Sequence, residues 1–179
     1  RIYERCGVRY FVVQSDPGMM GGGGSHEFMA PSPAGEDQVA LCPRCGYAAN
    51  LELAASRPAA PAFPAWKAPE EVATPNARTI AEVSALLRID PGLTIKSLVV
   101  VPESGGAVLA LVRGDQQLHE RKLARVLGPF RPAHREEVLE ATGVEPGFVG
   151  PMGQRLRILA DECLRQGTYV VGANKPDTH

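Results

Sequence analysis

Few residues of this chain have side chains suited to chemistry, and Lys96 is the first candidate. It stands directly before Ser97-Leu98-Val99-Val100-Val101, an apolar run that predicts a buried strand. A cation at the mouth of a strand suits a phosphate group. The alternative is an ordinary solvated lysine at the end of a strand.

A second candidate is the glycine loop in which Gly147 and Gly150 bracket Phe148 and Val149, directly before Pro151. Glycine has no Cβ, so its backbone N–H can approach a ligand closely. Such N–H groups are suited to stabilising an oxyanion or a substrate carbonyl. The alternative is an ordinary turn.

The cysteines give little support for a metal site. Cys42 and Cys45 form one Cys-x-x-Cys pair, but a structural zinc site needs four ligands. No second pair exists at usable spacing, and nothing in the spacing supports Cys6 and His26 as the missing ligands. We therefore expect no metal. A redox role is also disfavoured, because no thioredoxin-like unit surrounds the pair.

The composition defines three regions along the chain. Residues 1–55 alternate short β-type runs, near 10–14 and 38–41, with turns, and a short helix is expected from Asn50 to Ala54. Residues 56–73 are rich in proline and alanine, which predicts a semi-extended linker. Residues 74–179 read as one compact domain.

The elements expected in the third region are of both kinds. Helical spacing covers 77–87, with a capping box at Thr79 and Glu82, and further helices are expected at 120–127 and 135–142. Strands are expected at 97–101, 107–112, 157–160 and 169–172. The pattern favours an α+β fold, with a mixed, mostly antiparallel, barrel-like sheet and flanking helices.

Charge and hydropathy exclude some classes of protein. The net charge of −1 argues against non-specific coating of nucleic acid, although one RNA end could still dock at a local patch. No apolar run is long enough to span a bilayer. The chain starts with Arg and has no signal-peptide core, which suggests a piece of a longer protein. Four uneven cysteines favour a reducing cytosol.

An ordered set of motifs resembles bacterial-type prolyl-tRNA synthetases. The set covers nearly the whole chain and consists of Gly21 to Phe28, Gly35-Glu36-Asp37, Cys42 to Asn50, Thr74 to Ile80, Thr94 to Leu98, Leu111 to Asp115, Gly147 to Pro151 and Gly172-Ala173-Asn174. Residues 1–55 resemble a strip of the class II catalytic core. Residues 74–179 resemble the insertion domain, which is shared with free-standing aminoacyl-tRNA deacylases. The resemblance implies hydrolysis of alanine mischarged onto proline tRNA.

The resemblance also implies roles for particular residues. Lys96 matches a family lysine that contacts the terminal adenosine or its phosphate, and the Gly147–Gly150 loop, with Phe148, matches one that lines the editing pocket. His179, together with Gly172, Ala173 and Asn174, matches the end of that pocket, where the histidine helps to recognise a small amino acid. The resemblance therefore implies that Lys96, Gly150 and His179 serve catalysis. Water is the expected nucleophile, aided by the free ribose hydroxyl of the substrate.

Three further positions match the family less closely. Asp161 resembles an acidic residue near the pocket, but its spacing to Gly172 is one residue short, so a helix cap or a surface carboxylate is an equal alternative. His119 stands where the family has asparagine, and this favours a plain turn at Arg113-Gly114-Asp115 that leads into a solvated helix, rather than a polar contact with RNA. Glu27 is a remnant of the proline-activating site, and the glycine tract 17–24 before it resembles a mobile loop more than a phosphate cradle.

The resemblance further implies partners and context. The partners are the acceptor end of tRNA(Pro), alanine or another small mischarged amino acid, and a second copy through the synthetase core, with no DNA and no membrane. Editing is expected to need no cofactor, while the intact synthetase would use ATP and Mg²⁺ in the cytoplasm. Two alternatives remain: a free-standing deacylase, and a tRNA-binding module without hydrolytic activity.

Overall fold

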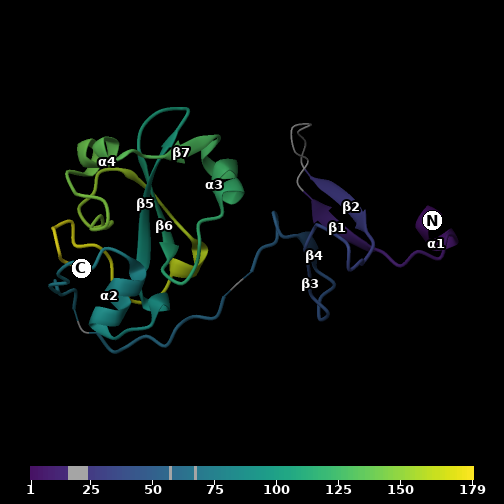
Figure 1. The fold of residues 1–179 in the computed structure, drawn as a ribbon, viewed down its shortest axis with the longest axis horizontal. Helices are drawn as coiled ribbons and strands as arrows, with labels where there is room; N and C mark the ends of the chain where they lie inside the picture. The colour runs from purple at the N-terminus through teal and green to yellow at the C-terminus, as the bar shows by residue number, and fades with distance from the viewer. Residues whose placement is uncertain (16–23, 57, 67) are drawn as a thin grey trace. The chain divides into compact units, whose positions relative to one another are not determined.

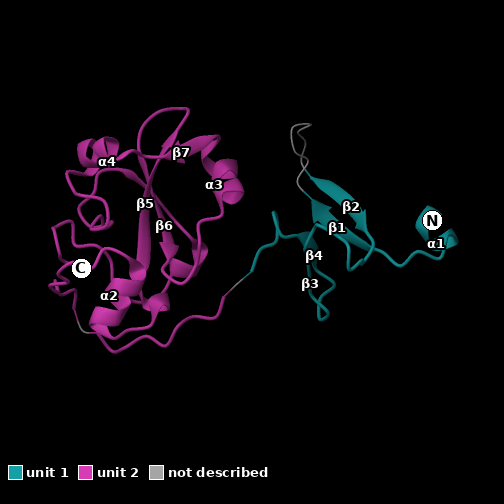
Figure 2. Ribbon diagram, viewed as in Figure 1, with its two compact units in different colours: residues 1–57 teal, residues 58–179 magenta. Residues whose placement is uncertain are grey.

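The computed structural model describes residues 1–15, 24–56, 58–66 and 68–179. The chain forms two compact units, residues 1–57 and 58–179 (Figure 2). The glycine tract discussed above lies outside the described residues, apart from Gly24. No helix in the described ranges has the length and apolar character that crossing a membrane requires.

The first unit is a small sheet with strand order β2-β1-β4-β3. Its elements are α1 (Ile2–Arg5), β1 (Phe11–Ser15), β2 (Ser25–Met29), β3 (Val39–Leu41) and β4 (Ala48–Asn50). Strand β1 pairs antiparallel with β2 and parallel with β4. The core is minimal: Val13 and Ala49 are fully buried, whereas Phe11, Val12 and Phe28 remain exposed.

The predicted helix from Asn50 to Ala54 is wrong. Asn50 ends strand β4, and a turn follows it. The Asn50 side chain accepts a hydrogen bond from the Glu52 N–H at 3.2 Å. Asparagine often forms this local bond, which favours a turn over a helix.

The second unit contains a four-stranded sheet with order β7-β5-β6-β8. Its elements are α2 (Ile80–Leu87), η2 (Pro91–Leu93), β5 (Ile95–Pro102), β6 (Val108–Arg113), α3 (Glu120–Leu127), β7 (Phe130–Pro132), α4 (Arg135–Thr142), β8 (Arg157–Ala160) and η3 (Glu162–Leu164). Strands β5 and β6 run through the middle of the unit, among the helices (Figure 1). Every residue of β6 is buried, as expected for a central strand covered on both faces.

The predicted α+β class is confirmed, and the sheet is mixed and mostly antiparallel. Strand β5 pairs antiparallel with β6 and β7, and β6 pairs parallel with β8. The expectation of a barrel-like sheet is wrong, because β7 and β8 are edges and no closed barrel forms in the described residues. The short β7 ends at Pro132, which has no N–H to donate and so suits an edge position.

Several helices and strands begin or end at residues other than those expected from the sequence. Helix α2 begins at Ile80, with Thr79 as its N-cap, and the predicted capping box with Glu82 is present. Strand β5 begins at Ile95, so Lys96 lies within the strand and pairs with Val112. The strand expected at 169–172 is reduced to one isolated bridge, between Thr94 and Val170.

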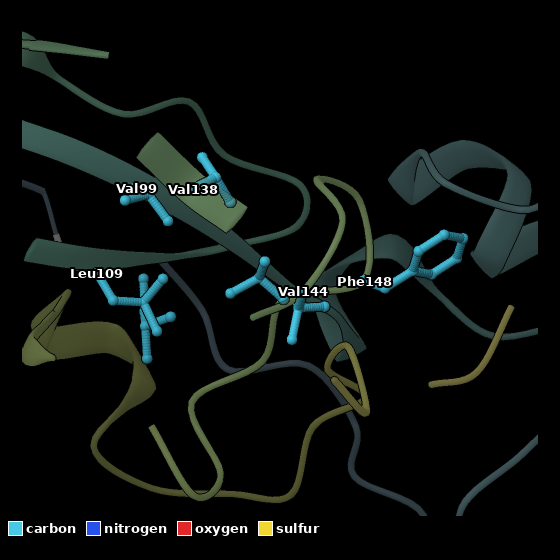
Figure 3. Packing of buried hydrophobic residues seen from close by; sticks show 7 residues of the cluster. Val99, Leu109, Val138, Val144 and Phe148 are labelled. Carbon is cyan, nitrogen blue, oxygen red and sulfur yellow. The ribbon is translucent and has the colours of Figure 1, made fainter. Parts of the chain in front are cut away.

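One apolar cluster joins the sheet to the glycine loop of the second unit. Its members come from β5, β6, α4 and the loop after α4, and they are Val99, Leu109, Leu111, Val138, Val144, Phe148 and Val149 (Figure 3). Phe148 is 1% exposed. The loop from Gly147 to Gly150 is therefore anchored to the core rather than lying free at the surface.

Candidate active site

Two backbone segments that are distant in sequence meet at Gly150 and Gly172. A Cβ on Gly150 would lie 1.7 Å from the Gly172 carbonyl oxygen, and a Cβ on Gly172 would lie 2.3 Å from the Phe148 carbonyl oxygen. Both distances are far inside van der Waals contact. Glycine is therefore required at both positions, because any side chain would push the two segments apart.

Asn174 ties the two segments together. Its backbone N–H donates to Phe148 O at 3.0 Å, and its Nδ2 donates to Met152 O at 2.7 Å. Its Oδ1 accepts from Gly150 N at 2.8 Å and from Gln154 Nε2 at 2.9 Å. The Gly150 N–H is therefore bound to Asn174 in this structure and is not free to donate to an oxyanion.

The packing of Gly150 leads to a stability prediction. Gly150→Ala should lower the free energy of unfolding by about 3 kcal/mol, since its Cβ would collide with backbone and overpacking costs are of this order. The control is Gly153→Ala, where φ is +73° and the space is open, so only backbone strain of about 1 kcal/mol applies. Chemical denaturation of both variants gives the comparison, and equal losses would contradict the close packing.

His179 is held by side-chain and backbone contacts. Its Nδ1 lies 2.6 Å from the hydroxyl of Thr74, which is fully buried. Its backbone exchanges two hydrogen bonds with Val72, at 2.7 and 3.0 Å. The ring packs edge-on against Phe148, with the ring centroids 5.9 Å apart. The structure therefore places His179 beside the glycine loop.

The surroundings of His179 favour its neutral form. Burial lowers the pKa of His179 below its ordinary value, and a hydrogen bond with the Gly147 backbone offsets this only in part. In the tautomer whose ring N–H donates to the Gly147 backbone, Nδ1 accepts from the Thr74 hydroxyl, and the next prediction tests this assignment. As pH falls below 6.5, the unfolded chain binds the proton first, so this residue reduces stability toward acid pH.

This arrangement predicts the effect of removing the Thr74 hydroxyl. Thr74→Val should raise the pKa of His179, because the neutral ring loses a hydrogen-bond donor, and should cost about 1 kcal/mol of stability. An NMR titration of the His179 ring measures the first effect, and a denaturation curve measures the second. A pKa that stays constant or falls would show that Thr74 does not donate to Nδ1.

A cavity of about 1070 Å³ lies next to His179. Its described walls are residues 65, 66 and 68–72, residues 168–173, Leu87 at the end of α2, Ile89, Met152 and His179. Gly172 and Ala173 are thus lining residues of the cavity. Lys96, Asn174, Asp161 and the Gly147–Gly150 loop are not among its described lining residues.

Lys96 lies on β5, with its Nζ donating to the backbone oxygen of Gln116 at 2.5 Å. The residue before it, Ile95, donates its N–H to Val170 O, and Val170 lines the cavity. Lys96 is thus held by the strand adjoining one cavity wall. The expectation of a lysine just before a strand is corrected to a lysine one residue inside it.

Asp161 caps the short helix η3. Its Oδ1 accepts from the Cys163 N–H at 2.9 Å, and its side chain is exposed. The structure therefore has Asp161 as a helix cap, which was one of the alternatives from the sequence.

The Cys163 thiol next to Asp161 is a poor nucleophile. Burial and, to a smaller extent, the Asp161 side chain raise the pKa of Cys163 to about 11, so the thiol stays protonated.

Arg113 was expected to lie in a plain turn, but it is only 5% exposed. Its Nε and Nη2 donate to the two carboxylate oxygens of Asp115 at 2.6 and 2.8 Å, and its Nη1 donates to Ala59 O at 2.8 Å. The hydrogen bonds from the Arg113 guanidinium hold the pKa of the Asp115 carboxyl below its usual value. Nothing local in the sequence indicates this contact, because Ala59 is more than fifty residues away.

Because of such contacts, the proline- and alanine-rich residues 58–66 and 68–72, here called the strap, belong to the second unit. Phe63 packs edge-on against Tyr169, with ring centroids 5.3 Å apart. Glu71 forms an ion pair with Lys175 at 2.7 Å, and Val72 pairs with His179. The segment expected as a linker is thus also a wall of the cavity.

The first unit contains the remaining candidates. Glu27 on β2 accepts a hydrogen bond from the Ser15 hydroxyl at 2.6 Å. Backbone hydrogen bonds from Cys45 and Arg44 lower the pKa of Cys42. Among the described residues, no three His, Cys, Asp or Glu side chains gather where they could hold a metal ion.

Solved structures define the class to which this fold belongs. A candidate trans-editing enzyme for prolyl tRNA synthetase aligns with a TM-score of 0.55 and 34% identity, over 61% of this chain and 72% of that one. The family model described as the aminoacyl-tRNA editing domain matches residues 74–179. The chain therefore belongs to the aminoacyl-tRNA editing domain family.

Curated relatives extend the similarity to the whole chain. The proline–tRNA ligases of Thermodesulfovibrio yellowstonii and Geobacter sulfurreducens are 46% and 44% identical over all of it. The resemblance to prolyl-tRNA synthetases is thus confirmed. The chain spans about a third of the length of these relatives, with 31% and 32% of each covered.

Proposed function

We propose that residues 74–179 hydrolyse alanine mischarged onto proline tRNA, as the editing domain of a prolyl-tRNA synthetase. The observation that carries the proposal is the cavity beside His179, in a domain of the aminoacyl-tRNA editing family. Residues 1–55 are then a strip of the synthetase core, and 56–73 join the two. The intact enzyme would use ATP and Mg²⁺ as a cytoplasmic homodimer.

A second site is needed because alanine is smaller than proline. A pocket built for proline cannot exclude alanine, since missing carbon atoms give only about 1–3 kcal/mol of discrimination. A pocket that admits alanine and rejects proline by size restores accuracy. His179, Gly172 and Ala173 lie where such a size limit could be set.

Hydrolysis requires a water, a positioned ester and donors for the developing negative charge. Water oxygen attacks the carbonyl carbon, the bond to the ribose oxygen breaks, and that oxygen takes a proton. Lys96 would hold the RNA end through its phosphate or adenosine, and the substrate's free ribose hydroxyl would assist the water. Because the Gly150 N–H is bound to Asn174, its use as an oxyanion donor would require Asn174 to move.

The test is ester hydrolysis by the full 179-residue chain. Alanyl-, cysteinyl- and prolyl-tRNA(Pro) are incubated separately, and the loss of each ester is followed. We expect alanyl-tRNA to be hydrolysed most rapidly. Tight binding of tRNA without ester loss would instead support the binding module, and similar rates on alanyl esters of several tRNAs would favour the free-standing deacylase.

The proposal also predicts that hydrolysis needs no metal. Dialysis against a strong chelator should leave the rate unchanged, since the described residues contain no cluster of three or more metal-binding side chains. Addition of Zn²⁺ or Mg²⁺ after dialysis provides the control. A rate that falls on chelation and recovers with one of these ions would contradict the water-only mechanism.

A further inference from the structure

The strap is fixed at both ends, and its second half, residues 65, 66 and 68–72, lines the cavity. Near its start, Ala59 O accepts a hydrogen bond from the buried Arg113 at 2.8 Å. At its end, Val72 pairs with His179 through two backbone hydrogen bonds, at 2.7 and 3.0 Å. Release of the strap from the domain would therefore break these hydrogen bonds, one of which is made by the buried Arg113.

Phe63 attaches the strap to the domain at a third point, where its ring packs against a glycine. Its ring lies edge-on to Tyr169 and against Gly167, where φ is +108°. A Cβ on Gly167 would stand 2.1 Å from the Phe63 ring atom Cζ. Any side chain at residue 167 would thus displace Phe63, so the sequence of the domain is fitted to the strap.

Trp66 follows three residues later and lines the cavity. It is 38% exposed, and two other large apolar cavity residues, Val72 and Met152, are 39% and 69% exposed. Apolar side chains gathered around one cavity and left open to solvent are typical of a ligand site. Trp66 is the aromatic member of this group.

Given the function proposed above, the size of the cavity and its carboxylates favour a nucleoside that carries an amino acid as the ligand. The ester joins the amino acid directly to the ribose, so the terminal adenosine must lie adjacent to the His179 pocket. A volume of about 1070 Å³ exceeds what one alanyl group needs. Glu70 and Glu71 are among the described lining residues, and because Glu71 is paired with Lys175, Glu70 is the carboxylate that could attract the substrate ammonium.

We propose that Trp66, presented by the docked strap, stacks on the adenine of the terminal nucleotide and so binds the RNA end in the cavity. Aromatic side chains are the common platforms for unpaired bases of RNA. This proposal rests on the proposed function for the identity of the ligand. It makes the strap part of the substrate site instead of a passive connection.

Trp66 is the only tryptophan of the chain, so its fluorescence reports on the site directly. The probe is 3′-(L-alanylamino)-3′-deoxyadenosine, an amide that resists hydrolysis, and the control ligand is N-methyl-L-alaninamide, which lacks the nucleoside. We expect a saturable fluorescence change with the first and none with the second. No change with the adenosine probe up to its solubility limit would overturn the proposal.

Kinetics give the second measurement. Trp66→Ala should raise the KM for alanyl-tRNA(Pro) about tenfold with kcat nearly unchanged, because a stack on the base is formed equally in ground and transition states. Trp66→Phe should restore most of the loss, and Phe63→Ala should mimic it by releasing the strap. Leu86→Ala removes an exposed apolar residue that does not line the cavity, and it should have no effect.

The outcomes separate the two proposals. An unchanged KM in Trp66→Ala, in a chain that hydrolyses alanyl-tRNA, overturns the role of Trp66 and leaves the function standing. A chain without hydrolysis overturns the function, and the fluorescence titration then still decides whether the adenosine probe binds at Trp66. Equal melting temperatures of wild type and variants exclude unfolding as the cause.

Discussion

Lys96→Ala is expected to lower the single-turnover rate of alanyl-tRNA(Pro) hydrolysis by about a hundredfold, because Lys96 would hold the RNA end in place and a small misplacement of the reacting ester can cost about that much. Lys96 lies on β5, and its neighbour Ile95 is bonded to Val170 in the cavity wall, so the strand fixes the position of the ammonium group. The fold should survive, since the side chain makes one hydrogen bond, to a backbone carbonyl, that water can replace.

Two comparisons make the Lys96 result specific. Arg165→Ala removes another positive charge, one that is exposed and paired with Glu162, and should leave the rate unchanged. If Lys96 contacts phosphate, its loss should also reduce the slope of log binding constant against log salt by about 0.7. Unaltered hydrolysis in Lys96→Ala, with an unchanged melting curve, would remove Lys96 from the site.

The second large effect concerns selection between amino acids. The wild-type chain should hydrolyse alanyl ester at least about tenfold faster than prolyl ester, because overpacking a close-fitting pocket costs about 1–3 kcal/mol and 1.4 kcal/mol is one decade. His179→Ala should narrow this ratio rather than slow both reactions equally. The physical reason is that His179 lines the cavity and is held by Thr74, Phe148 and Val72.

A control variant separates the effect of the size of the His179 side chain from the effect of its hydrogen bond to Thr74. Thr74→Val removes one hydrogen-bond partner of the ring but keeps its packing on Phe148 and the backbone pairing with Val72, so it should preserve most of the ratio. The comparison should be repeated in a chain extended past residue 179, so that local unfolding near the terminus does not mimic the effect. An equal decrease for both esters would assign His179 a structural or catalytic role instead of a selective one.

Much of the second unit could be predicted from the sequence because its signals are local. The capping box of Thr79 and Glu82 sets the start of α2, and Gly128 and Gly143 end the next two helices. The apolar run of β6 predicts a buried strand, and its hairpin with β5 needs only a short turn. The position of Lys96 at the start of a strand was predicted to within one residue for the same reason.

Other features had no local signal. Strand β7 has three residues and contains a proline, so it forms only because β5 offers it an edge. Residues 169–172 resemble a strand, but only Val170 is paired, because Leu93 and Ile95 supply its hydrogen-bond partners there. The sheet was expected to resemble a barrel, and only the pairing of β8 beside β6 showed that it stays open.

The sequence by itself determined the family, the α+β class and the candidate residues, because motif order and short-range periodicity survive without coordinates. Only the tertiary structure decided how these residues are used. It bound the Gly150 N–H to Asn174, across 24 positions, and tied Arg113 to Ala59, across 54. These contacts form because the packed core brings distant chain segments together. The spacing of residues along the sequence does not show which distant segments will meet. For that reason the strap, with Trp66 beside the cavity, became visible as part of the site only in the fold.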